Sequence, residues 1–217
     1  MNNSIIPWLS LLLSLVILGA YEVHLSVLSR RHPLATARSA HALLREEWVQ
    51  ALSRQAGSEI VAVQALRNSL MSATITASTA ALALMGTLTV TSTTMVQDMA
   101  LFGMRQLSTR LALELLLLAT LFASYVCSAT AMRYFSHGSF IMSLPVASEE
   151  RVRRTPLAID YVRRAGVLYS WGLRLFLFLA PIVAGLVNPL AMPFAAIVLT
   201  LVLRAFDRAP SGSAPLA

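Results

Sequence analysis

The stretch AVQALRNSLMSATITASTAALALMG, residues 62–86, decides the fold class of this chain. It is apolar enough to lie in a bilayer, where a helix needs about 20 predominantly apolar residues to cross about 30 Å of hydrocarbon. It also carries an arginine, an asparagine and a series of serines and threonines. The stretch therefore predicts a membrane helix and raises the question of why that helix contains polar groups.

The rest of the chain fits the same class. Its 217 residues are 57% hydrophobic and 12% charged, with a mean hydropathy of +0.69, which is typical of a multi-pass membrane protein. Apolar runs predict spans at about 5–24, 64–92, 109–132, 168–187 and 190–206. We expect an all-α bundle of four to five transmembrane helices over residues 1–208. The last apolar run is short, so it either just spans the bilayer or forms a re-entrant segment. A disordered tail is expected over 209–217.

Arginines at the edges of these runs predict the orientation. The segments between the first and second runs and between the third and fourth are the arginine-rich ones, with Arg30, Arg31, Arg38, Arg45 and Arg54 in the first and Arg133, Arg151, Arg153, Arg154, Arg163 and Arg164 in the second. The positive-inside rule places both in the cytoplasm. Five crossings then put the N-terminus outside and the C-terminus inside. The absence of lysine among the 17 basic residues favours a bacterial inner membrane.

Two further helices are expected on the cytoplasmic side. The first is an amphipathic helix between the first two spans, because small and apolar residues recur at three- and four-residue spacing at Ala37, Ala40, Leu44, Trp48 and Ala51. The second begins before the fourth span at Ser148, a good N-cap residue that is followed by two glutamates. Pro156 is expected to interrupt it. The basic character of the chain is explained by lipid headgroups, so we expect no nucleic-acid partner.

Several stretches of the chain resemble a known family. They are REEW at 45–48, AVQALRNSLMSATITAST at 62–79, CSATAMRYFSH at 127–137 and GLRLFLFLAP at 172–181. They are similar to the plant and bacterial membrane family known as domain of unknown function number five hundred and ninety-nine, over about residues 22–207. The resemblance implies a multi-pass membrane fold and no established chemistry, so it supplies no catalytic residues.

Charged side chains near the predicted cytoplasmic boundary form the first candidate site. Glu22, Arg67, Asn68, Arg133 and Arg174 are expected at this depth. Because an ionised group at the edge of hydrocarbon is costly, one interpretation is a charge-paired belt with Glu22 bonded to Arg67 or Arg174. The other is an anion-attracting mouth, since three arginines outnumber one glutamate.

A small, hydroxylated face of the second span is the next candidate. Ser69, Ser72, Thr76 and Thr79 follow one another at steps of three, four and three residues. Small residues let helix backbones approach closely, and their hydroxyls can bond across the contact or back to their own helix. Alternatively, the same face lines an anion path, which requires several copies of this helix around a common axis.

Glu114 lies inside the third predicted span, four residues after Arg110. An intrahelical ion pair is one interpretation. A proton or cation site is the other, because intramembrane carboxylates are often functional.

Enzyme signatures are absent from the sequence, and its four histidines lack metal-ligand spacing. We therefore expect no enzyme and no cofactor, and two functional hypotheses are left. The first is a homo-oligomeric anion channel or transporter, in which Arg67→Ala lowers flux. The second is a non-catalytic scaffold or accessory subunit that binds another membrane protein.

Overall fold

The computed structural model describes residues 5–31, 36–102 and 108–208, with the backbone alone over 93–102. These residues form helices in the order α1 (Ile5–Arg31), α2 (Ala37–Leu52), α3 (Glu59–Phe102), α4 (Thr109–Met142), α5 (Glu149–Leu177), α6 (Leu179–Val187) and α7 (Ala191–Phe206). Four stretches are long and apolar enough to cross a membrane, namely Ile5–Arg31, Glu59–Ser92, Thr109–Met142 and Glu149–Val187. The predicted all-helical membrane class is confirmed. The expected disordered tail over 209–217 lies outside the described residues.

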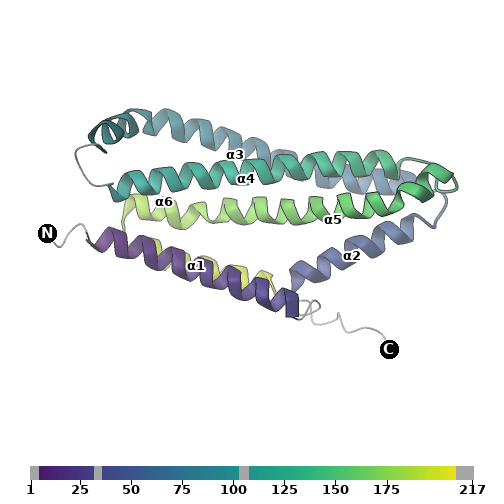
Figure 1. Ribbon diagram of the computed structural model, residues 1–217, viewed down its shortest axis with the longest axis horizontal. Coiled ribbons are helices and arrows are strands. Elements are labelled where there is room, and N and C mark those ends of the chain that lie inside the picture. The colour runs from purple at the N-terminus through teal and green to yellow at the C-terminus, as the bar shows by residue number, and fades with distance from the viewer. Residues whose placement is uncertain (1–4, 32–35, 103–107, 209–217) are drawn as a thin grey trace.

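The three longest helices, α3, α4 and α5, lie side by side along the length of the molecule (Figure 1). At one end, α1, α6 and α7 pack together, and α6 contacts α4. At the other end, α2 slants across to α5 (Figure 1). An apolar core fills each end, around Phe135 and Val162 near α2 and around Leu121 and Ile182 near α1.

Serine caps fix where two of the long helices begin. The Ser108 hydroxyl accepts a hydrogen bond from the Leu111 amide before α4, and the Ser148 hydroxyl accepts one from the Arg151 amide before α5. Each cap satisfies an amide that has no partner within the helix. The predicted start of the second cytoplasmic helix at Ser148 is therefore confirmed.

The expected interruption at Pro156 does not occur, because α5 continues through this residue. The proline removes the donor for the carbonyl of Val152, a residue that is 67% exposed. The break comes later, at Phe178 between α5 and α6. It lies within one turn of Pro181, whose ring clashes with the carbonyl of Leu177.

A buried arginine joins the helices at the α2 end of the molecule. Arg151 is 1% exposed, and its guanidinium donates to the carbonyl of Ile141 at 2.6 Å and to the Ser53 hydroxyl at 3.3 Å. Beside it, the Glu59 carboxylate accepts from the Val146 amide at 3.0 Å. The ends of α2, α3, α4 and α5 are therefore held together by polar contacts.

Helix α2 occupies residues where the sequence predicts an amphipathic helix, and its packing buries Ala37 of the expected apolar face together with Val49 from beside that face. Leu44, on the expected apolar face, is 60% exposed, whereas Val49 is fully buried. Packing against α5 selects the buried face. The placement of α2 on a membrane surface stays a prediction.

The last helix reverses direction after Asn188 and runs back beside α6 and α1. Its end is fixed by the chain around Thr36, where the Ala37 amide donates to the carbonyl of Asp207 at 3.1 Å. The end of α7 therefore lies beside the start of α2, well inside the length of the bundle (Figure 1). Whether α7 crosses a membrane completely stays a prediction.

Candidate functional site

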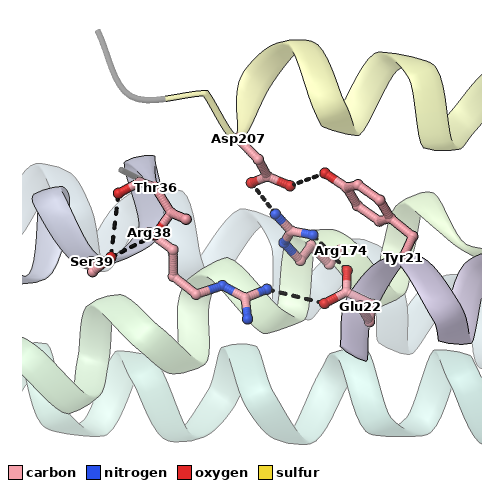
Figure 2. A network of polar contacts seen from close by, with 7 residues as sticks. All are labelled: Tyr21, Glu22, Thr36, Arg38, Ser39, Arg174 and Asp207. Atoms are coloured by element: carbon pink, nitrogen blue, oxygen red, sulfur yellow. Dashed lines mark hydrogen bonds and ion pairs between the residues drawn. The ribbon is translucent and has the colours of Figure 1, made fainter. Parts of the chain in front are cut away.

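A polar cluster lies where α1, α2, α5 and the end of α7 meet (Figure 2). At its centre, the Arg174 guanidinium bonds the Glu22 carboxylate at 2.5 Å and also bonds the Asp207 carboxylate. The second oxygen of Asp207 accepts from the Tyr21 hydroxyl at 2.6 Å. The second oxygen of Glu22 pairs with Arg38 at 3.2 Å. We call these five residues the Arg174 cluster.

The cluster is extended on the α2 side. Arg38 lies over the ring of Trp171, with 4.8 Å between its guanidinium carbon and the ring centroid, a distance at which a cation is attracted by the aromatic face. On either side of Arg38 in the sequence, Thr36 and Ser39 have their hydroxyls 2.5 Å apart (Figure 2). The first turn of α2 is thereby attached to α1 and α5.

Formal charges within the Arg174 cluster cancel, because two arginines face two carboxylates. The sequence interpretation counted Glu22 as the one carboxylate available at this depth, and Asp207 is the second. Such a neutral, mutually bonded set holds helices together and leaves no excess positive charge with which to attract an anion. The geometry favours the charge-paired interpretation at this place.

Arg67 and Arg133 are not brought into the cluster. Both side chains are exposed, and neither has an ion pair within the part of the chain that the structure describes. Gly138 packs against Leu66 and Val162, and Gly172 packs against Ser128. This register places Arg67 roughly twelve helical residues, or about 18 Å, further along the bundle than Arg174.

The hydroxylated face of α3 lies beside the face that packs on α4. The packed face consists of Ala73, Ala77 and Ala80, all buried, whereas Ser72 and Thr79 are exposed. Each hydroxyl of the stripe formed by Ser69, Ser72, Thr76 and Thr79 donates to the carbonyl four residues earlier, at 2.9–3.2 Å. The stripe therefore satisfies its own hydroxyl protons within α3.

Arg67 does not lie on this stripe. Ser72 follows it by five residues, which is about 140° around a helix. The arginine that reaches the stripe is Arg45 of α2, because Arg45 lines the same cavity as Ser69 and Ser72.

This cavity of about 400 Å³ lies between α2, α3, α4 and α5 and is lined by Arg45, Trp48, Ala65, Leu66, Asn68, Ser69, Ser72, Phe135, Val162 and Tyr169. We call it the Arg45 cavity. Its polar residues come from α2, α3 and α5, and its apolar walls belong partly to the core near α2. Burial of the Arg45 guanidinium lowers its pKa from the ordinary arginine value, because desolvation disfavours the charged form.

Glu114 is 2% exposed on α4. One of its carboxylate oxygens accepts from the Arg110 guanidinium at 3.1 Å, which is the intrahelical pair that the spacing predicts. The other oxygen has no hydrogen-bond partner among the described residues. Glu114 lies on a different helix from the α3 stripe and outside the lining of the Arg45 cavity, so it belongs to neither site.

Four residues of these sites were missed from the sequence, namely Tyr21, Arg38, Arg45 and Asp207. For Asp207 a signal was present, because it directly follows the fifth apolar run and a fifth crossing returns it to the depth of Glu22. For Arg38 and Arg45 the sequence indicates only a surface helix. Their inward contacts depend on how α2 packs against α5.

Comparison with known proteins gives one match. A family model described as "Protein of unknown function, DUF599" matches residues 9–211, which confirms the resemblance seen in the sequence. No curated protein and no solved structure matches the chain.

Proposed function

This chain belongs to the DUF599 family of proteins of unknown function, and we propose that it is a non-catalytic scaffold of the membrane that assembles with a second copy of itself. The face of α3 that carries Ser72, Thr79 and Gly86 forms the contact. We propose the bacterial inner membrane as its location, with the N-terminus outside and the arginine-rich segments inside.

The observation that supports this proposal is the one-sided packing of α3. Its buried alanines face α4, and α3 makes few contacts with any other helix. The stripe beside them consists of small residues, of which Ser72 and Thr79 are exposed, and its hydroxyl protons are satisfied within α3. A side chain added at Gly86 would meet nothing within 4 Å in its own chain. Small residues along such a face permit the close backbone approach on which helix association in membranes depends.

A second copy is the partner that this surface favours. In a two-fold symmetric dimer, both copies use the same surface in the contact. The small side chains of the stripe on one α3 helix would then pack against the same small side chains on the other. The Arg174 cluster is internally neutral and leaves assembly to apolar and small residues.

The test compares two leucine variants in purified protein. Thr79→Leu places a large side chain on the stripe, and Ser78→Leu places the same side chain on an adjacent exposed position about 100° away around the helix. We expect the native chain and Ser78→Leu to be oligomeric by light-scattering mass in detergent, and Thr79→Leu to be monomeric. The proposal is contradicted if the native chain is monomeric, or if both variants lose the oligomer to the same extent. Copurification of an unrelated chain in fixed ratio would point to a different partner.

Anion conduction along the assembled stripe is a second candidate. The observation that favours it is the position of Arg45, which lines a cavity together with Ser69 and Ser72 at one end of the stripe and has no ion pair among the described residues. An arginine at that end would raise the local anion concentration.

Anion flux across liposomes tests conduction directly. At equal protein incorporation, we expect Arg45→Ala to lower the anion flux. Arg67→Ala should lower the flux less, because Arg67 lies on a different side of α3 from the stripe. Absence of flux from the native protein across several anions would exclude conduction and leave the scaffold function.

A further inference from the structure

The Arg45 cavity has the chemistry of a binding site, apart from any role of α3 in assembly. Arg45 is half-buried, yet its guanidinium makes no hydrogen bond and no ion pair within the described part of the chain. A guanidinium carries five N–H donors and stays charged in proteins. The partially desolvated donors of Arg45 are therefore available for an anion.

The Arg45 guanidinium lies against the backbone of α5 at Gly166. A Cβ atom at Gly166 would overlap the Arg45 guanidinium, and Gly166 is buried. Only a residue without a side chain leaves room for the planar group to lie against the helix backbone. The position of Arg45 in the cavity therefore depends on a specific feature of the α5 sequence.

The remaining lining supplies polar groups and no negative charge. Asn68 brings an amide, the hydroxyls of Ser69 and Ser72 have acceptor capacity, and Tyr169 brings a phenol, whereas none of the lining residues is a carboxylate. Trp48 forms part of the wall. Asn68 is exposed and lies outside the residues proposed for the α3 contact, so an anion can enter from the surface beside it.

The depth of the cavity agrees with the headgroup layer of a bilayer. Tyr169 precedes Arg174 by five residues and Val162 precedes it by twelve, so the cavity lies about 8–18 Å beyond the Arg174 cluster along α5. The apolar run of α1 ends at this cluster. By the extent of the apolar run of α1, the cavity therefore lies near the boundary between hydrocarbon and headgroups.

We propose that the Arg45 cavity binds the phosphate group of an anionic ligand. Phosphate oxygens match the planar donor fork of arginine and also accept from amides. The apolar walls then contact the organic part that is attached to the phosphate. A phospholipid headgroup and a free phosphate share this chemistry. The site does not require α3 to assemble, so it stands or falls independently of the scaffold function.

The test measures binding to the full chain purified in a neutral, phosphate-free detergent. Inorganic phosphate and short-chain phosphatidylglycerol are titrated separately by calorimetry. We expect saturable binding of one probe per chain, and a loss of affinity of about tenfold or more in Arg45→Gln, because a charge-assisted hydrogen bond is lost. Binding of phosphatidylglycerol alone identifies a lipid headgroup as the source, and binding of inorganic phosphate as well identifies a free phosphate.

Two further variants make the result decisive. Asn68→Asp changes an exposed residue to a near-isosteric carboxylate and should weaken binding even if Arg45→Gln fails to fold. Arg54→Gln removes the same charge from an exposed position of the segment after α2 and should leave affinity unchanged. Absence of saturable binding for both probes, or an equal loss in Arg54→Gln, overturns the proposal.

Discussion

Arg174 shows how one side chain can connect distant parts of a membrane chain. It is buried within α5 and contacts Glu22 of α1 and Asp207 at the end of α7. Each carboxylate also has a second partner, Arg38 or Tyr21. Removing one member of such a buried set leaves uncompensated charge, which is more costly than the net contribution of the intact set.

Replacement of Arg174 by glutamine should therefore destabilise the protein strongly. The variant leaves two carboxylates with one arginine, and we expect a loss of about 3 kcal/mol or more in the free energy of unfolding. Thermal unfolding in detergent measures the effect. Arg163→Gln is the matched control, because Arg163 forms an exposed pair with Asp160 and should change stability by less than about 1 kcal/mol. Equal losses in the two variants would contradict a structural role for the Arg174 cluster.

Helices α4 and α5 are in close contact around Gly172. The Ser124 hydroxyl donates to the carbonyl of Gly172 across the contact at 2.7 Å. A Cβ atom at Gly172 would overlap the Ser128 hydroxyl and lie 3.4 Å from the Ser124 carbonyl oxygen and the Ser128 amide. Interhelical hydrogen bonds of this kind contribute about 0.6 kcal/mol each on average. Close packing at Gly172, which requires a residue without a side chain, is therefore expected to contribute more to the stability of this contact than the hydrogen bond does.

Gly172→Ala should separate α4 from α5. We expect a loss of about 1–3 kcal/mol, because the added methyl group has no room in the packed contact. Gly19→Ala on α1 is the control, since its Cβ atom would meet nothing within 4 Å and alanine favours a helix over glycine by up to about 1 kcal/mol. Thermal midpoints of the two variants are compared with that of the native chain. If Gly172→Ala is as stable as Gly19→Ala, close packing at Gly172 is not needed.

For the whole molecule, the arrangement of the turns predicts which ends face the same side of the membrane. The turns between α2 and α3 and between α4 and α5 meet at one end, joined by Arg151 and Glu59. The turn between α6 and α7 lies at the other end (Figure 1). Because the arginine-rich segments accompany the first end, the positive-inside rule predicts that this end faces the cytoplasm.

Cysteine labelling in intact cells tests this orientation. In a Cys127→Ala background, we expect Gln55→Cys and Ala147→Cys to be protected from a membrane-impermeant maleimide until the cells are lysed. Leu190→Cys should react in intact cells. Arg208→Cys should be protected if α7 is a complete fifth crossing. Labelling of Leu190→Cys and Gln55→Cys from the same side would contradict the arrangement.

Much of the fold follows from local patterns. Apolar length identifies the membrane helices, and the serine before Glu149 marks the start of α5, because both effects depend on residues near in sequence. The continuation of α5 through Pro156 was not predicted. Helix α5 packs against α2 and α4, and this packing is a property of the folded molecule that the position of the proline in the sequence does not indicate.

The sequence by itself determined the helical membrane class, the family and the Arg110–Glu114 pair, since hydropathy and i,i+4 spacing act along the chain. Only the tertiary structure decided which charges meet. Glu22 and Asp207 share Arg174, and Arg45 rather than Arg67 lines a cavity with the stripe of α3, because different helices contribute the side chains at both places. Their partners depend on the rotation and register of packed helices, which composition and spacing do not specify.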